Sequence, residues 1–391
     1  MLRVLVLHNT YRFRGGEDVV VQNELDLLIR KGHIVKCHIL SNQRISTFWY
    51  KALVAIGALF SFSSYLSVKK IIDEFSPDIV HVHNFFPMLS PSIFYACRSK
   101  RVPVVLTLHN YRILCPTGLL MHEGKPNERS LAEGPWWALR HRVYQRSWIG
   151  TFVLCLMISL HHKLGTWRRL VDVFVTFTNF GRIRFEAGGI PADRIIVKPN
   201  FANSGVLSDE AVRKGILYVG RLSSEKGVVT MLDAMRAPSG ESLRSSLELI
   251  GDGPLAGLVT ERGVKWLGQL TPDEVRSHMQ AAQALLIPSI CYEGFPMVLV
   301  EAYACGLPVI ASRIGALAEL VEDGVTGLLF EPGDTEQLAN SVSWALCHPD
   351  QMRVMGQSAR KYYEENYTPE RNYERLMSIY HSAIVHCRAT I

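Results

Sequence analysis

Two glutamates, eight residues apart in a frame of glycine and proline, form the most informative pattern in this chain of 391 residues. Residues 291–310 are expected to form a loop, a helix, a glycine stop and a strand, in that order. Glu293 lies just before the expected helix and Glu301 lies more than one turn inside it. Because a carboxylate accepts several hydrogen bonds, the pair suits a ribose diol or the hydroxyls of a sugar.

The start of this helix is a predicted anion site. Pro296 suits the first helical turn, where its missing N–H has no partner to lose. The backbone N–H groups near Gly294, Phe295 and Met297 would then point out of the helix start, where the helix dipole favours a phosphate.

A second pattern places two cations after a strand. The strand expected at Ile216–Val219 leads into a loop that carries Arg221 and Lys226 before the next helix. Ligands of open α/β sheets bind at the carboxyl ends of strands. Two fixed cations at that place would neutralise a diphosphate and stabilise it as a leaving group. A glycine-rich turn at residues 251–254, also after a strand, lets a nucleotide approach the backbone.

The elements that must hold these residues alternate between strand and helix along the chain. Short apolar strands are expected at 3–7, 34–40, 79–83, 104–108, 171–177, 216–219, 247–250, 284–287 and 309–311. Helices are expected at 17–30, 227–236, 272–281, 296–304, 316–322 and 370–387. Continuous apolar strands separated by helices are typical of parallel sheets that are covered on both faces, so we predict an α/β protein with two doubly wound bodies.

The patterns around Lys226, Gly251 and Glu293 together resemble the nucleotide-binding half of the retaining glycosyltransferases of family 4, which have the GT-B fold. The resemblance is clearest from about Ile216 to Asp334. In the first half, Gly16 and its neighbour take the place of the family's glycine-rich loop, and residues 107–116 look like the histidine-bearing loop of a subgroup found in polysaccharide assembly. The similarity extends over nearly the whole chain.

The resemblance implies two Rossmann-like domains that face a central cleft. Residues 1–203 would bind the acceptor and residues 204–369 the nucleotide-sugar donor, and a C-terminal helix at about 370–391 would pack back on the first domain.

The resemblance also implies roles for single residues. Arg221 and Lys226 would hold the donor diphosphate, Glu301 the ribose, and Glu293 the donor sugar, with Gly16, Gly294, Phe295, Pro296 and Met297 completing the donor site. His109 would contact the donor sugar near the reacting centre. His81 and His83 have no such support and are expected to lie in a sheet.

Neither a metal nor another cofactor is expected. The chain has no Asp-x-Asp motif, so Arg221 and Lys226 would replace a bound divalent cation. No residue stands out as a glycosidase-like nucleophile, and the family's retaining chemistry is usually described as a displacement on one face, in which the leaving diphosphate helps to deprotonate the acceptor.

Charge divides the chain into a basic and an acidic half. Residues 1–200 carry 26 Lys and Arg against 13 Asp and Glu, and residues 201–391 carry 16 against 23. The positive charge of the first half is suited to binding a phosphorylated substrate, an anionic membrane or a nucleic acid, or it belongs to a solvated surface without a partner. Because no nucleic-acid motif is found, we expect a glycan or lipid-linked acceptor and an anionic membrane surface as partners, but no nucleic acid.

Two apolar segments with aromatic and basic borders lie in the basic half, at 48–66 and 148–160. Both are too short or too interrupted to span a bilayer. Each suits either a helix in a membrane interface or a buried core helix. The eight scattered cysteines suit reduced thiols, and we expect a cytoplasmic protein, peripheral on the cytoplasmic face of the inner membrane.

Two other classes remain open. Non-hydrolysing sugar-nucleotide epimerases share this architecture, although a single substrate leaves the basic, apolar half unexplained. A non-catalytic sugar-nucleotide-binding protein is the second alternative, but it has no need of Arg221, Lys226, Glu293 and Glu301 together.

Overall fold

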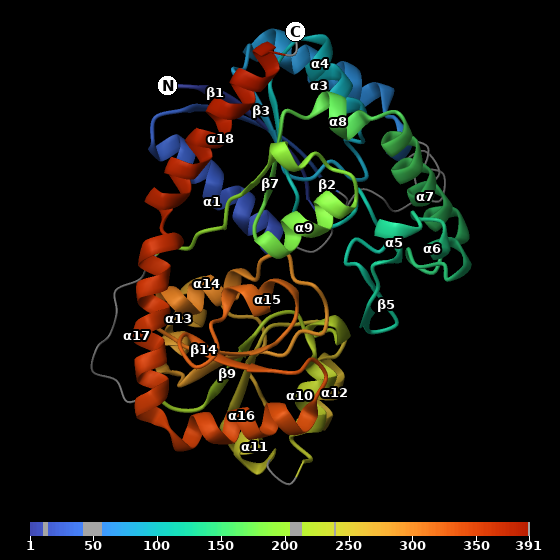
Figure 1. Ribbon diagram of the computed structural model, residues 1–391. Helices are drawn as coiled ribbons and strands as arrows, with labels where there is room; N and C mark the ends of the chain where they lie inside the picture. The colour runs from blue at the N-terminus through green and yellow to red at the C-terminus, as the bar shows by residue number, and fades with distance from the viewer. Residues whose placement is uncertain (11–14, 42–56, 204–212, 238–239, 390–391) are drawn as a thin grey trace. The chain divides into compact units, whose positions relative to one another are not determined.

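The computed structural model describes residues 1–10, 15–41, 57–203, 213–237 and 240–389. The chain divides into two compact units (Figure 1). Unit 1 comprises residues 1–122, 127–199 and 372–391, and unit 2 comprises residues 123–126 and 200–371.

Unit 1 is built around a six-stranded parallel sheet in the order β2-β1-β3-β4-β7-β8. Its strands are β1 (Arg3–Thr10), β2 (Ile34–Ser41), β3 (Ile79–Val82), β4 (Val104–Thr107), β7 (Val173–Thr176) and β8 (Ile195–Val197). Its helices are α1 (Gly16–Arg30), α3 (Phe62–Phe75), α4 (Ser92–Ser99), α5 (Arg129–Ala132), α6 (Trp137–Arg140), α7 (Trp148–Lys163), α8 (Thr166–Leu170), α9 (Asn179–Ala187) and the 3₁₀ turn η2 (Ala192–Arg194).

One face of this sheet is covered by α1 and by α18 (Pro369–Ala389), which run beside each other in Figure 1. Val4 and Val6 of β1 pack there against Leu25 of α1 and Leu376 of α18 in one apolar cluster. Successive side chains of a strand point to opposite faces, and Leu5 on the other face is also fully buried. Residues 4–7 of this strand are therefore apolar and buried on both faces, as the sequence predicts for a sheet covered on both sides.

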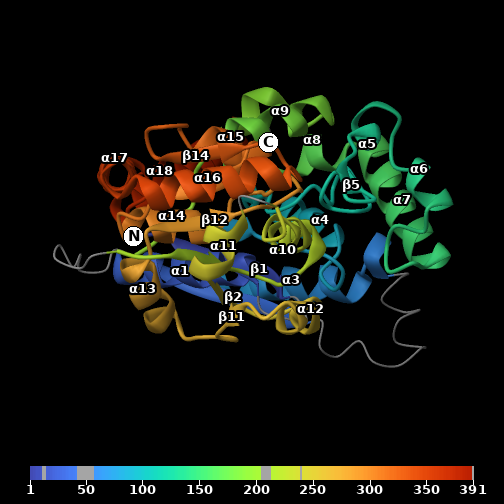
Figure 2. The same ribbon diagram turned by 90° about the horizontal axis from the view of Figure 1, so that it is seen from below.

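Helices α5, α6 and α7 lie together on one side of unit 1 in both views (Figures 1 and 2). Ser147 caps the start of helix α7, and its side-chain oxygen accepts the N–H of Gly150. A short two-stranded ribbon, β5 (Met121–His122) and β6 (Lys125–Pro126), precedes this group of helices.

Unit 2 holds a second six-stranded parallel sheet in the order β11-β10-β9-β12-β13-β14. Its strands are β9 (Ile216–Val219), β10 (Leu247–Ile250), β11 (Lys265–Trp266), β12 (Ala284–Ile287), β13 (Val309–Ser312) and β14 (Gly327–Phe330). Its helices are the 3₁₀ turn η3 (Ser224–Lys226), α10 (Val228–Ala234), α11 (Glu241–Ser246), α12 (Ala256–Glu261), α13 (Pro272–Ala281), α14 (Met297–Ala304), α15 (Gly315–Leu320), α16 (Thr335–Cys347) and α17 (Pro349–Asn366).

The expected α/β fold class is confirmed, because both sheets are parallel and doubly wound. In each sheet the strand order reverses at one point, between β1 and β3 in unit 1 and between β9 and β12 in unit 2. The loops that leave two such strands diverge to opposite faces and open a crevice, which is where open α/β sheets bind ligands. Both reversal points are consequently the places to look for a site.

Candidate functional site

The loops at the reversal point of unit 2 carry the best-supported site residues. The loop after β9 contains Arg221 and Lys226, and the loop after β12 contains Glu293 and leads into α14. The topology thus brings two patterns, far apart in the sequence, to one edge of the sheet.

Lys226 and Glu293 meet at this edge. The ammonium of Lys226 donates to Oε1 of Glu293 at 2.6 Å and to Oε2 at 2.8 Å. The hydroxyl of Ser289 donates to Oε1 of Glu293 at 2.6 Å. The glutamate side chain is 10% exposed and the lysine side chain is 31% exposed, so the pair is partly buried but still accessible to solvent. Sequence reasoning missed Ser289, although its place after β12 is a signal that was available.

Both groups of this pair are held in their charged forms. Burial alone favours neutral Lys226, but the Glu293 carboxylate beside it raises the pKa of Lys226 above its ordinary value. Burial likewise favours neutral Glu293, but Lys226 and then Ser289 bring the pKa of Glu293 below its ordinary value. The site therefore presents a fixed cation that an anionic ligand can share.

Close backbone packing shapes the lysine loop. Gly227, between η3 and α10, has φ +73°, and a Cβ there would lie 1.7 Å from the carbonyl oxygen of Pro288. Only glycine fits both the conformation and the space. This contact holds the β9 loop against the β12 loop and so sets the position of Lys226.

Arg221 contributes a second cation. Its side chain is exposed and makes no hydrogen bond or ion pair within the described residues, while its carbonyl accepts the hydroxyl of Tyr218 at 2.9 Å. The backbone of Arg221 is thus fixed, and its guanidinium is open to solvent.

Helix α14 begins one residue later than expected. Pro296 is not in the first turn but takes the N-cap position, with an extended backbone of φ −72° and ψ 109°, and the helix starts at Met297. Phe295 and Pro296 are buried, whereas Gly294 and Met297 are half-buried. The first N–H groups of a helix have no partners within it, so this terminus offers backbone donors beside Glu293.

Glu301 lies within α14, and its surroundings differ from those of Glu293, which is bound by Lys226 and Ser289. Its half-buried carboxyl makes no hydrogen bond or ion pair with the residues that the structure describes. Burial raises the pKa of Glu301, and the positive charge of Arg276 opposes that shift. An unsatisfied carboxyl in such a setting is suited to hydroxyl donors from a ligand.

The reversal point of unit 1 is lined by histidines. His8 of β1 bonds through Nε2 to Oδ1 of Asp18 at 2.9 Å, and Asp18 also accepts the N–H of Gly15 through Oδ2 at 2.9 Å. The expectation that Gly16 lies in a loop is wrong, because Gly16 is the first residue of α1. His83 is also not in a strand, since it follows the end of β3.

His109 follows β4 at the same edge of the sheet. It is half-buried, and its Nε2 lies 3.1 Å from Nδ1 of His83. Burial, followed by the neighbouring His83 and His8, lowers the pKa of His109 well below its ordinary value, so the ring is neutral. Its ring also packs against Phe177, at 5.2 Å between centroids.

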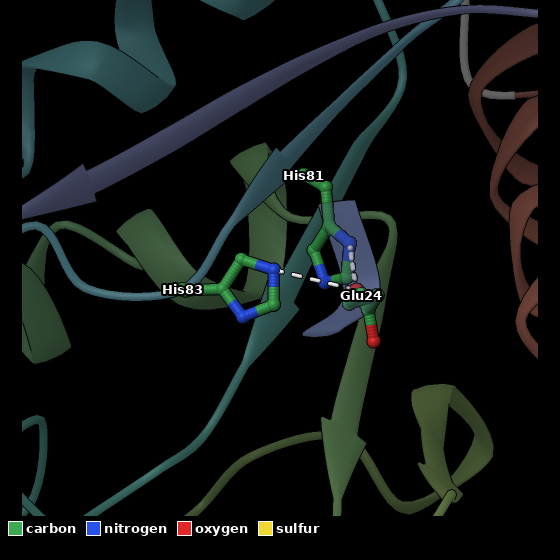
Figure 3. A group of neighbouring side chains, drawn as sticks. All are labelled: Glu24, His81 and His83. Atoms are coloured by element: carbon green, nitrogen blue, oxygen red, sulfur yellow. Dashed lines mark ion pairs between the residues drawn. The ribbon is translucent and has the colours of Figure 1, made fainter. Parts of the chain in front are cut away.

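A buried carboxylate underlies these histidines. Figure 3 shows Glu24 of α1 facing both His81 and His83. Its Oε1 lies 3.1 Å from Nδ1 of His81 and 3.4 Å from Nε2 of His83, while its Oε2 accepts the ammonium of Lys198 at 3.0 Å. Sequence reasoning missed Glu24 and Lys198, since no local pattern marks them.

Three of these side chains are close enough to hold a metal ion. The ligand atoms of Glu24, His81 and His83 lie within 4.8 Å of one another. However, Lys198 already neutralises Glu24, and both nitrogens of His81 have hydroxyl partners. The cluster therefore fits a self-contained hydrogen-bond network better than a cation.

Helix α7 has two apolar faces. Leu154, Met157 and Ile158 are buried against neighbouring apolar residues of unit 1. On the outside, Ile149 is 71% exposed and Phe152 is 45% exposed. Of the other expected segment, 48–56 lies outside the described residues, and Phe60 and Phe62 are exposed. No helix in the described ranges is both long and apolar enough to cross a membrane.

A basic pocket adjoins the end of α7. Its volume is about 510 Å³, and its lining contains no acidic side chain. The lining consists of His162, Lys163, Gly165, Arg168, Arg169, Gly189 and Arg194. Because α8 leads into β7 and Arg194 directly precedes β8, the pocket lies at the amino ends of these strands, opposite the edge that holds His109.

Comparisons with known proteins agree with this architecture. Residues 14–204 match Glycosyltransferase Family 4, and residues 213–348 match Glycosyl transferases group 1. An uncharacterised glycosyltransferase of Methanocaldococcus jannaschii is 25% identical over 378 residues, which is 93% of each chain.

Solved structures show the same fold. Sucrose-phosphate synthase from Thermosynechococcus elongatus superimposes with a TM-score of 0.70 at 18% identity, over 98% of this chain and 99% of that chain. Anabaena HepE in complex with UDP-glucose superimposes with a TM-score of 0.66 at 19% identity, over 97% of this chain and 100% of that chain.

Fold and family together define a glycosyltransferase enzyme with the GT-B fold. The chain belongs to the group 1, family 4 glycosyltransferases, as the sequence patterns around Lys226 and Glu293 predict.

Proposed function

We propose that this enzyme transfers a sugar from a nucleoside diphosphate sugar to a glycan or lipid-linked acceptor, with retention at the anomeric carbon, in polysaccharide biosynthesis. The observation that carries the proposal is the Lys226–Glu293 pair at the reversal point of unit 2. The same edge holds Arg221 and Glu301, whose side chains make no hydrogen bond or ion pair with any described residue. HepE, which shares the fold, has been solved with UDP-glucose.

Each group at this edge matches one part of such a donor. Lys226 and Arg221 supply two positive charges for the diphosphate, and the start of α14 supplies backbone N–H groups. Glu301 accepts hydrogen bonds from the ribose hydroxyls. Glu293, kept ionised by Lys226, accepts hydrogen bonds from the donor sugar.

Catalysis in this proposal relies on charge stabilisation. As the bond between sugar and diphosphate breaks, negative charge grows on the leaving oxygen, and Lys226 and Arg221 stabilise it. A leaving-group oxygen on the same face then accepts the proton of the acceptor hydroxyl, which attacks and gives retention. No metal and no other cofactor takes part, and neutral His109 contacts the donor sugar.

The acceptor side uses unit 1, and we propose that it meets an anionic membrane on the cytoplasmic face. The exposed apolar face of α7 and the basic pocket at its end support this. Apolar burial combined with lysine and arginine is the pattern of interfacial helices. Nucleic acid is not part of the proposal, because neither unit carries a recognised nucleic-acid motif.

A panel of sugar nucleotides tests the proposal. Purified enzyme is incubated with each donor and a membrane extract, and both nucleoside diphosphate release and glycan formation are measured. At least one donor should give both products, and NMR of the product should show the anomeric configuration of the donor. An inverted product contradicts retention. Conversion of a donor into its epimer, without nucleoside diphosphate release, supports an epimerase instead.

A further inference from the structure

We infer that Glu24, acting through His83, is a positioning residue that fixes the tautomer of His109, so that Nδ1 of His109 is presented as a hydrogen-bond acceptor for a substrate hydroxyl. The inference rests on the proposed function, in which His109 meets the donor sugar. It adds Glu24 and His83 to the residues on which the reaction depends.

The first step is the charge of Glu24. The side chain is buried in α1, and its Oε2 accepts the equally buried ammonium of Lys198 at 3.0 Å. Burial by itself opposes ionisation, but Lys198 and then His81 bring the pKa of Glu24 well below its ordinary value. Glu24 is therefore an ionised carboxylate, which only accepts hydrogen bonds.

The second step is the proton of His83. Oε1 of Glu24 is buried without a well-aligned hydrogen bond, and Nε2 of His83 faces it at 3.4 Å (Figure 3). A lone pair on Nε2 would repel the carboxylate, whereas an N–H there satisfies it. Burial, followed by His81, lowers the pKa of His83 to about 3, so the ring carries a single proton, which is on Nε2.

The third step transfers this constraint to His109. Nδ1 of His83 has no proton left and must accept, and Nε2 of His109 lies 3.1 Å away. Nε2 of His109 must therefore carry the proton and donate it. Because the ring of His109 is neutral, its Nδ1 has a free lone pair, and no described residue donates to that nitrogen.

His81 faces the same carboxylate but makes no hydrogen bond to His109 within the described residues. Its Nδ1 lies 3.1 Å from Oε1 of Glu24 and 2.9 Å from the hydroxyl of Tyr380, and its Nε2 lies 2.8 Å from the hydroxyl of Thr107. A hydroxyl either donates or accepts, so both hydroxyls adapt to whichever nitrogen of His81 carries a proton. In the part of the chain that the structure describes, the path from Glu24 to His109 therefore runs through His83.

The direct test is NMR of the full-length protein with ¹⁵N-labelled histidine. The signals of His83 and His109 are assigned from His83→Asn and His109→Gln. We expect both rings to carry the proton on Nε2, with a coupling across the hydrogen bond from Nε2 of His109 to Nδ1 of His83. A proton on Nδ1 of either ring overturns the inference, and this readout does not depend on any enzymatic activity.

Glu24→Gln tests the part played by the carboxylate. Lys198 only donates, so it attracts the new amide oxygen and turns the NH₂ group toward His83. Nε2 of His83 must then accept, its Nδ1 must carry the proton, and the tautomer of His109 reverses. Asp26→Asn, an exposed change on the same helix, is the control.

We expect Glu24→Gln to lower kcat about tenfold, the effect of one lost hydrogen bond, with little change in the KM of the donor. A folded Glu24→Gln protein in which His109 keeps its proton on Nε2 overturns the inference. If Glu24→Gln does not fold, the proton positions of His83 and His109 in the wild-type protein are sufficient to support or overturn the inference. An enzyme inactive with every donor, but with the expected tautomers, contradicts the proposed function and not the tautomer assignment.

Discussion

The ammonium of Lys226 donates to both carboxylate oxygens of Glu293, at 2.6 and 2.8 Å, across a sequence separation of 67 residues. The pair links the loops that follow the two strands at the reversal point of the second sheet. Its lysine carries the positive charge that a diphosphate requires, and its glutamate keeps that lysine charged in a partly buried place.

Lys226→Ala should slow transfer strongly and leave the fold intact. Removing one charge-stabilising group costs roughly 2–4 kcal/mol of transition-state stabilisation. The measurement is kcat/KM together with a thermal melting curve, and Lys361→Ala, an exposed lysine on α17, is the control. Rates within about threefold of wild type, equivalent to less than 1 kcal/mol, would show that Lys226 does not stabilise the transition state.

Glu301→Gln should weaken donor binding and stabilise the free protein. Burial raises the pKa of Glu301, so the folded state binds a proton more tightly than the unfolded state does. For such a group, stability falls as pH rises from the ordinary carboxyl pKa through the folded one. The variant should therefore melt higher than wild type at about pH 7.5 and equally at about pH 4.

The control for Glu301→Gln is Glu261→Gln, an exposed change on α12. Donor affinity should fall in Glu301→Gln only. If the melting difference between wild type and Glu301→Gln were the same at both pH values, the carboxyl would not be the cause.

Gly227→Ala should destabilise unit 2 by at least about 2 kcal/mol, because a non-glycine residue at positive φ is strained and its Cβ meets the carbonyl of Pro288 at 1.7 Å. Gly257→Ala is the matched control, since its Cβ meets nothing within 4 Å and it lies inside α12. That change should be neutral or stabilise by about 1 kcal/mol. Urea denaturation of both variants measures the difference, and equal midpoints would show that the close contact does not constrain the loop.

Activity should persist in excess chelator. Arg221 and Lys226 supply the positive charge for the leaving diphosphate, so no divalent cation is needed at that place. The measurement is the transfer rate before and after removal of metal ions. Loss of activity in chelator with recovery on adding magnesium or manganese would contradict this assignment.

Binding to anionic vesicles should depend on both apolar and basic residues of unit 1. Ile149→Ser/Phe152→Ser removes exposed apolar area from α7, and Arg168→Ala/Arg169→Ala removes two cations, each worth about 1 kcal/mol near the surface. Sedimentation with vesicles should show weaker binding for both variants and, for wild type, weaker binding at high salt.

Val354→Ser removes an exposed apolar side chain from unit 2 and is the control for vesicle binding. It should bind as wild type does. A wild-type protein that does not sediment at low salt, or folded α7 variants that bind normally, would contradict the membrane proposal.

Much of the fold follows from the sequence because the central strands of both sheets are buried. A buried parallel strand is a short, continuous apolar run, so strands such as Leu247–Ile250 and Ala284–Ile287 are found at their predicted bounds. The strands β8, β11 and β14 were not predicted. Each is only two to four residues long and lies at the edge of its sheet, and β11 also lacks an apolar run. The order of strands depends on contacts between distant segments, which the apolar pattern does not encode.

The candidate site divides in the same way. The sequence alone predicts Arg221, Lys226, Glu293 and Glu301 as candidate site residues, because each lies in a short local pattern of strand, glycine and helix. Only the tertiary structure joined Lys226 to Glu293, and only it shows that the Glu301 carboxyl makes no hydrogen bond or ion pair within the described ranges. Glu24, His83 and Lys198 carry no local signal at all, since their chemistry arises from long-range packing that buries one carboxylate between a distant lysine and two imidazoles.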